Sequence, residues 1–179
     1  DVYKRQSTQS TNEDTDVGIT GISVADPDSG SSSIRLTLAT DRGDLSLAGT
    51  SGLSFSAGDG SADATMTFTG TISAINTAIA TVTFSPDDDD DNNATLTVTA
   101  NDLGNTVDGS QDSGSAQSDV ETVAITVNGS NDAPVVTVPS TQSTNEDTDV
   151  GITGISVDDD DAGSSSIRLT LATDRGDLS

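Results

Sequence analysis

A long internal repeat limits what this chain can fold into more than any other feature of its sequence. Residues 7–46 recur as residues 140–179, an offset of 140 − 7 = 133 positions. Only Ala25, Pro27 and Ser29 are replaced within these 40 aligned positions. Similarity at a fixed period is the signature of arrays of like modules. We therefore expect a tandem array, of which the chain holds one full period and the start of the next.

The repeat also predicts how the chain divides. We expect a complete module at residues 7–133, and a linker with the first third of the next module at residues 134–179. Both ends are then cuts in a larger protein. Residues 1–6 read DVYKRQ, which resembles a translated sequencing adapter, and we expect them to be foreign to the protein.

Hydrophobic periodicity within one period indicates strands. Short β-branched runs alternate apolar and polar residues between clusters of Gly, Asp, Asn and Ser, the pattern of half-buried strands. Ile34, Leu36 and Leu38 should share one face. The expected strands are residues 17–24, 34–40, 45–47, 53–55, 65–69, 82–84, 95–100 and 122–127.

One stretch departs from this alternation. Ser73 can cap a short helix in which Ile75 and Ile79 are four residues apart. Seven or eight short antiparallel strands with one such helix favour an all-β, immunoglobulin-like sandwich. Aromatic residues make up only 2% of the chain, so Ile, Val and Leu, including a face of Val123, Ile125 and Val127, should form the core.

Composition excludes several functions. The net charge of −24 argues against nucleic acid or anionic membrane as a partner, because phosphate recognition needs basic side chains. The sequence has no His and no Cys, which removes Ser-His-Asp and Cys-His catalysis and nearly every zinc site. No apolar run reaches the ~18 residues of a membrane span. We expect no enzyme and no membrane insertion in this piece.

The acidic residues are strongly biased towards Asp. Glu occurs only at Glu13, Glu121 and Glu146 among 30 acidic residues. Asp is the short carboxylate that suits both tight turns and oxygen cages around hard cations. Divalent cations are therefore the natural partners of this chain.

Two segments carry a family resemblance. TLTVTANDLGN, followed by VETVAITVNGSNDAPV, is similar to the end of a cadherin domain, where an A-x-D-x-G stretch precedes a last strand and an NDxAP-type linker. The residues that carry this match are Asp102, Gly104, Asn131, Asp132, Ala133 and Pro134. The NED triplets with Glu13 and Glu146, and the acidic pairs Asp26 with Asp28 and Asp159 with Asp161, resemble two further cadherin elements. Over residues 7–179 the chain resembles the cadherin-like repeats of large bacterial adhesins, including the RTX kind exported by type I secretion.

The resemblance implies calcium sites between modules. Ca²⁺ takes six to eight oxygen ligands, more than one loop supplies. By analogy the first copy contributes Glu13, Asp26 and Asp28, and the site between units uses Asp102, Asn131, Asp132, Glu146, Asp159 and Asp161. Gly129 stands where a cadherin has Asp, and no LDRE element is present, which would leave fewer ions per junction. The alternative is that these residues are turn formers.

Two acidic runs and a repeated tripeptide are open to more than one interpretation. Residues 87–91 and 158–161 are runs of five and four Asp; we favour solvated, self-repelling loops, with weak calcium binding second. RGD at residues 42–44 and 175–177 could be an integrin ligand. The alternative is that the tripeptide is a Gly-Asp turn at the tip of a hairpin and binds no partner.

The function expected from the resemblance is a structural or adhesive module of a large extracellular bacterial surface protein. Calcium would stiffen the junctions between adjacent repeats in cell adhesion or biofilm formation. The alternative is a module that binds a glycan or receptor, or a like module, with calcium only structural. The near absence of Trp and Tyr, which stack on sugars, places this alternative second.

Overall fold

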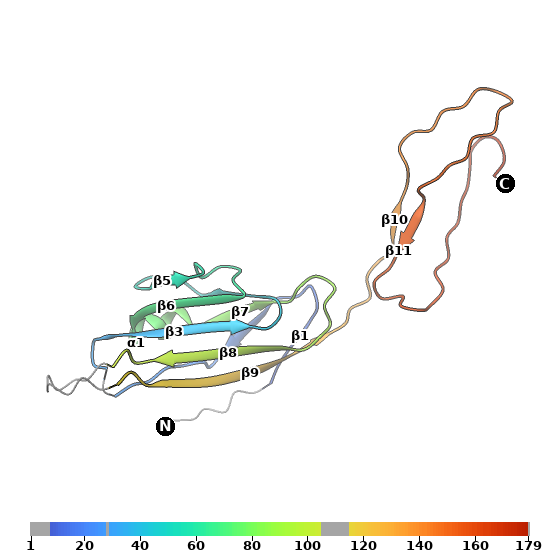
Figure 1. Ribbon diagram of the computed structural model, residues 1–179. Coiled ribbons are helices and arrows are strands. Elements are labelled where there is room, and N and C mark those ends of the chain that lie inside the picture. Colours follow the sequence, from blue (N-terminus) through green and yellow to red (C-terminus); the bar gives the residue numbers. More distant parts are fainter. Residues whose placement is uncertain (1–7, 28, 105–114, 179) are drawn as a thin grey trace. The chain divides into compact units, whose positions relative to one another are not determined.

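The computed structural model describes residues 8–27, 29–104 and 115–178. It divides into two compact units, Asp1–Gly129 (unit 1) and Ser130–Ser179 (unit 2) (Figure 1). The elements of unit 1 are β1 (Gln9–Asn12), β2 (Val17–Thr20), β3 (Ser33–Thr40), β4 (Asp44–Leu47), β5 (Ser54–Ala57), β6 (Thr65–Thr71), α1 (Ile72–Ala78), β7 (Thr81–Ser85), β8 (Ala94–Asn101) and β9 (Ser118–Asn128). Unit 2 contains β10 (Val135–Thr137) and β11 (Ser156–Asp158). No helix in these ranges is long and apolar enough to cross a membrane.

Unit 1 is a β-sandwich. One sheet has the strand order β1-β9-β8-β3-β6-β5, and the other has the order β2-β7-β4. The pairings are antiparallel except between β1 and β9, which run parallel with Gln9 opposite Ile125. The expected all-β sandwich with one short helix is confirmed.

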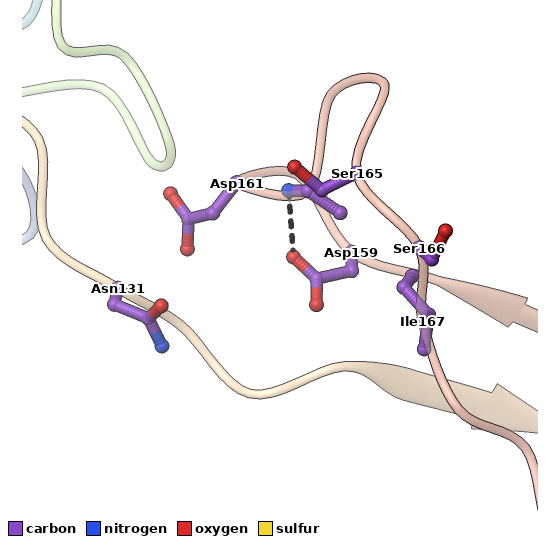
Figure 2. A pocket seen from close by; sticks show the side chains of 7 residues that line it. Asn131, Asp159, Asp161, Ser165, Ser166 and Ile167 are labelled. Carbon is purple, nitrogen blue, oxygen red and sulfur yellow. Dashed lines mark hydrogen bonds between the residues drawn. The ribbon is translucent and has the colours of Figure 1, made fainter.

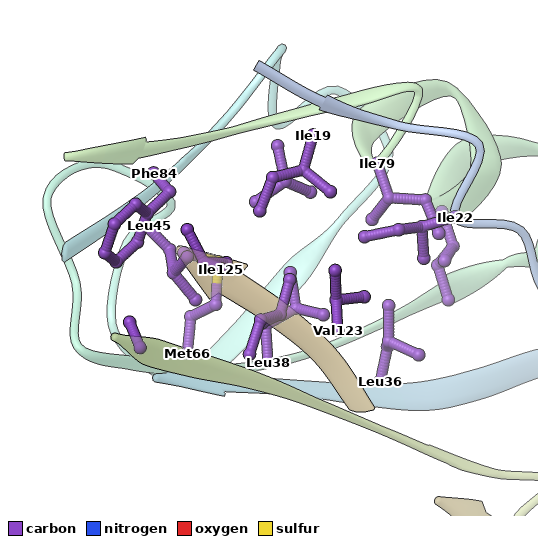
Figure 3. Packing of buried hydrophobic residues seen from close by; sticks show 14 of the residues in the cluster. Ile19, Ile22, Leu36, Leu38, Leu45, Met66, Ile79, Phe84, Val123 and Ile125 are labelled. Atoms are coloured by element: carbon purple, nitrogen blue, oxygen red, sulfur yellow. The ribbon is translucent and has the colours of Figure 1, made fainter. Parts of the chain in front are cut away.

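The core lies between the two sheets of unit 1 (Figure 3). Ile34, Leu36 and Leu38 are at most 2% exposed, and the expected face of β9 (Val123, Ile125, Val127) is at most 5% exposed. Alternation therefore identified the buried faces of β3 and β9 correctly. The expectation of an aliphatic core was incomplete, because Met66, Phe68 and Phe84 are fully buried as well.

Helix α1 begins two residues earlier than its sequence suggests. The hydroxyl of Thr71, not Ser73, accepts the backbone N–H of Ala74 at 3.3 Å. Thr71 is the last residue of β6 and keeps extended backbone angles, as an N-cap residue does. Ile75 and Ile79 are fully buried, so the helix contributes to the core.

Strand β2 is shorter than the expected 17–24 and ends at Thr20. Gly21 follows with φ +85° and breaks the strand. A side chain then takes over the hydrogen bonds that a neighbouring strand would supply. Asn76 Oδ1 accepts the backbone N–H of Val24 at 2.8 Å, and Asn76 Nδ2 donates to Val24 O at 2.9 Å.

The first four strands depend on the rest of the module. β1 pairs with β9, β2 and β4 pair with β7, and β3 lies between β6 and β8. None of these four pairs with another of them. Among the described pairings, residues 7–46 therefore form no sheet by themselves. All their strand partners lie later in the sequence of unit 1.

Unit 2 repeats the sequence of these first strands but not their sheet structure. Its two short strands pair with each other, with Val136 opposite Val157. Ile152, Leu169 and Leu171 are 49%, 45% and 56% exposed. The repeated segment without its partner strands thus leaves its apolar residues in solvent.

Candidate metal centre

Oxygen-bearing side chains of unit 2 gather around an open hollow of about 300 Å³ (Figure 2). The hollow lies beside the turn that the acidic run 158–161 forms at the end of β11. The backbone N–H of Ala162 donates to Asp159 Oδ1 at 2.9 Å, which closes this turn. The lining residues are Asn131, Asp159, Asp161, Ala162, Ser165, Ser166 and Ile167.

The linker is tied to this acidic turn within unit 2. The backbone N–H of Asp132 donates to Asp161 Oδ2. Four residues expected to bind metal, Asn131, Asp132, Asp159 and Asp161, therefore lie in one region. Their donors are carboxylate and amide oxygens, joined by the Ser165 hydroxyl, and this is the hard-oxygen chemistry that Ca²⁺ selects. The donor types at this hollow are therefore compatible with a calcium ion.

A second acidic group lies at the end of unit 1 where β9 ends. The backbone N–H of Glu13 donates to Asn128 O at 2.9 Å. A Cβ built on Gly129 would lie 3.6 Å from Asp91 Oδ2 and 3.7 Å from Glu13 Oε1. Two carboxylates therefore flank Gly129. Asp91 was not among the expected ligands; only its place in an acidic run pointed to it.

Asp102 does not join this acidic group. It follows Asn101, which pairs with Ser118 at the start of β9, whereas Glu13 is bonded to Asn128 at its end. Ten residues of strand separate these two positions on β9, or about 33 Å. The structure therefore places Asp102 and Glu13 at opposite ends of unit 1.

The Asp102 carboxylate closes a turn instead. Asp102 Oδ1 accepts the backbone N–H groups of Gly104 at 2.8 Å and Gln117 at 2.7 Å. These two hydrogen bonds favour the charged form and hold the pKa of Asp102 below its ordinary value of 3.8. These hydrogen bonds support the alternative interpretation, in which Asp102 is a turn former and not a metal ligand.

The remaining expected ligands have separate surroundings. Asp26 is partly buried, and its backbone carbonyl accepts the Ser29 hydroxyl at 3.0 Å. Asp28 lies outside the described residues. Glu146 is exposed in a turn, where its carbonyl accepts the Thr148 hydroxyl at 3.4 Å, and it does not line the hollow of unit 2.

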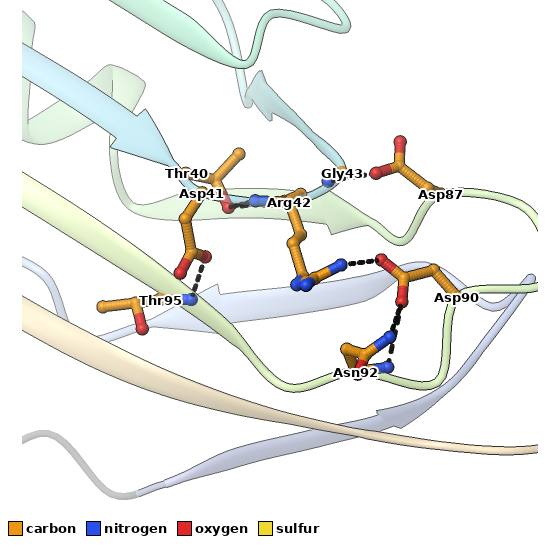
Figure 4. Close-up of polar contacts among 8 residues, drawn as sticks. All are labelled: Thr40, Asp41, Arg42, Gly43, Asp87, Asp90, Asn92 and Thr95. Atoms are coloured by element: carbon orange, nitrogen blue, oxygen red, sulfur yellow. Dashed lines mark hydrogen bonds and ion pairs between the residues drawn. The ribbon is translucent and has the colours of Figure 1, made fainter.

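The acidic run at residues 87–91 contacts the RGD segment of unit 1 (Figure 4). Arg42 Nη1 lies 2.7 Å from Asp90 Oδ2, and the backbone N–H of Gly43 donates to Asp87 Oδ2 at 2.9 Å. Hydrogen bonds from Asn92, and then from Arg42, hold the pKa of Asp90 below its ordinary value. The loop is solvated, as expected, since four of its five aspartates are exposed, but Asp87 and Asp90 are held by the RGD segment and not only repelled by their neighbours.

The RGD segment itself is a corner between sheets. It joins β3 of the larger sheet to β4 of the smaller one, so the expected hairpin tip within one sheet is wrong. The hydroxyl of Thr40 donates to Arg42 O at 2.6 Å, and the backbone N–H of Thr95 donates to Asp41 Oδ1 at 2.6 Å. These contacts give the RGD residues a structural role in unit 1.

Comparison of the chain with protein-family models, curated proteins and solved structures gives no match.

Proposed function

We propose that the chain is a calcium-binding structural repeat of a large extracellular adhesive protein. The observation that supports this most is the hollow of unit 2, where Asn131, Asp159 and Asp161 present oxygens from the linker and from the turn after β11. A β-sandwich with an acidic group at the end where the linker begins suits a structural module in a series. The adhesive role rests on the resemblance to cadherin-like repeats.

The charge balance supports a divalent cation as the ligand. The chain carries 30 acidic and 6 basic residues, so its carboxylates far outnumber the possible partners in ion pairs. Ca²⁺ bound among them offsets their mutual repulsion and stabilises the folded state, by an amount that rises with the logarithm of its concentration above the dissociation constant. Repeats of extracellular proteins bind calcium with dissociation constants of about 0.1 to 1 mM.

Calorimetric titration of the full chain with Ca²⁺ tests the proposal. We expect saturable binding in the millimolar range or tighter. The double substitution Asp159→Asn and Asp161→Asn should remove one binding step or weaken it about tenfold, because it takes two charged ligands from the hollow.

A matched control separates ligation from loss of charge. Asp174→Asn with Asp177→Asn removes the same two charges from unit 2 outside the residues that line the hollow, and it should leave the titration nearly unchanged. Equal losses in both double variants would mean nonspecific screening. Absence of binding at several millimolar Ca²⁺ would refute the calcium site.

A further inference from the structure

The segment 140–179 of unit 2 is nearly the same polypeptide as residues 7–46, yet its apolar residues have the opposite exposure. In unit 1 the core residues contributed by this segment are at most 8% exposed, and in unit 2 their counterparts are 37–56% exposed. The pairs, written with the unit 1 residue first, are Ile19 and Ile152, Ile22 and Ile155, Ile34 and Ile167, Leu36 and Leu169, Leu38 and Leu171, and Leu45 and Leu178.

Unit 1 shows what covers these residues. Leu36 lies opposite Phe68 of β6 on one side and opposite Ala100 of β8 on the other. Ile19 lies opposite Val82, and Leu45 lies opposite Phe84, both in β7. Every strand partner of residues 7–46 in the described sheets belongs to residues 47–129.

The turns of the segment already have the same form in both units. The Thr11 hydroxyl donates to Thr15 O at 2.5 Å, and the Thr144 hydroxyl donates to Thr148 O at 2.8 Å. The intervening aspartates of these turns both have positive φ. At the RGD corners, Thr40 and Thr173 each donate to the carbonyl two residues later at 2.6 Å. Unit 2 thus has the same two turns as unit 1, although its strand pairing differs.

We propose that the exposed apolar face of unit 2 is an acceptor for one kind of partner, a polypeptide with the sequence of residues 47–129. Such a polypeptide supplies β6 and β8 on either side of residues 166–173, β7 for residues 150–153 and 177–179, and β9 for residues 142–145. The contacts formed are those that unit 1 already makes, so the surface selects its partner by the same registers.

Co-refolding tests the surface with the intact chain. The isotope-labelled full chain is diluted from urea with an equimolar, unlabelled polypeptide of residues 47–129, and amide exchange is read by NMR. We expect a 1:1 complex in which the amides of Leu169 and Leu171 gain about 100-fold protection. In the chain alone these amides should exchange freely, with no dimer by light scattering. A complex in which the amides of Leu169 and Leu171 exchange as fast as in the chain alone would overturn the proposal.

A substituted chain shows whether unit 2 is the acceptor. Leu169→Asp with Leu171→Asp places two charges on the proposed face and leaves the sequence of unit 1 untouched. This variant should not form the complex. If it binds the added polypeptide as well as the parent chain does, the proposal is overturned.

A single-chain experiment avoids aggregation of the added polypeptide, which exposes its apolar core residues when it lacks residues 7–46. Residues 47–129 are joined after Ser179 in a single chain. We expect a second cooperative unit, seen as an unfolding enthalpy about twice that of the original chain and as protection of Ile167, Leu169 and Leu171. This arm decides the outcome: if these amides stay unprotected in the joined chain, the proposal is overturned.

Discussion

Gly43 and Gly176 occupy the same position in the two copies of the repeated segment, but their surroundings differ. Both have positive φ, +63° and +72°, a region that side chains with a Cβ rarely adopt. A Cβ on Gly43 would also lie 2.3 Å from the backbone oxygen of Ser85, whereas nothing lies within 4 Å of a Cβ on Gly176. Only the first glycine is required both for its backbone conformation and for close packing.

The substitution Gly43→Ala should therefore lower the free energy of unfolding of unit 1 by about 3 kcal/mol, from backbone strain and a steric clash together. The matched substitution Gly176→Ala should leave the unfolding of unit 1 unchanged. Urea unfolding followed by circular dichroism measures both. Equal midpoints for the two variants would show that the corner of unit 1 can relax at little cost.

The Asp102 carboxyl group makes the stability of unit 1 depend on pH. Its pKa is lowered in the folded protein by the backbone N–H groups of Gly104 and Gln117. A carboxyl group with a depressed folded pKa adds stability above its unfolded pKa, and this contribution is lost as the pH falls through the folded pKa. The contribution is thus complete above about pH 5 and declines below pH 3.8, the ordinary value.

We expect Asp102→Asn to flatten the loss of stability between about pH 4 and pH 2, because the amide oxygen still accepts hydrogen bonds but does not titrate. Urea unfolding at a series of pH values measures the slope. Asp174→Asn, in unit 2, is the control and should leave the slope for unit 1 as it is. A parallel pH profile for Asp102→Asn and the parent chain would contradict this role.

Among the elements, turns and strands differ in how far the sequence alone specifies them. The Thr11 and Thr144 turns have the same hydrogen bonds in both units because they need only neighbouring residues. Strand β3, with strong apolar alternation, was predicted closely, yet the same letters form no strand at residues 166–173. Strand formation there depends on partners that are distant in the sequence.

The same reasoning explains what sequence analysis missed. Strand β1 reads QSTN and has no apolar alternation; it exists because β9, more than a hundred residues later, pairs with it. The resemblance to cadherin repeats placed Asn131, Asp159 and Asp161 in one site, and in the structure these three residues line the same hollow. The end of the sandwich at which Asp102 lies depends on strand order, which local patterns do not reveal, and so its distance from Glu13 could not be predicted.

Helix α1 offers a test at this scale, since sequence and structure assign its cap to different residues. Thr71→Ala should lower the free energy of unfolding by about 1 kcal/mol, because it removes the acceptor for the Ala74 N–H. Ser73→Ala should change it by less than about 0.5 kcal/mol. Thermal or urea unfolding of the two variants distinguishes these roles. If Ser73→Ala lowers the free energy of unfolding more than Thr71→Ala does, Ser73 is the capping residue, as the sequence suggested.

At the scale of the whole chain, charge opposes compactness. A net charge of −24 on 179 residues generates self-repulsion that any salt screens, and this screening raises stability without a specific site. The Arg42–Asp90 ion pair is exposed and adds little against this background. General screening and calcium binding both predict stabilisation by CaCl₂, so a melt with and without calcium does not separate them.

Melting at matched ionic strength separates the two effects. In NaCl the midpoint should rise modestly with concentration as screening increases. In CaCl₂ at the same ionic strength it should rise further, because an ion that binds only the folded state stabilises it by about 1.4 kcal/mol for each tenfold excess over the dissociation constant. MgCl₂ should fall short of CaCl₂, since Mg²⁺ demands a stricter octahedral geometry and gives up its waters reluctantly. Identical midpoints in all three salts would leave screening as the whole effect and would exclude stabilisation by calcium.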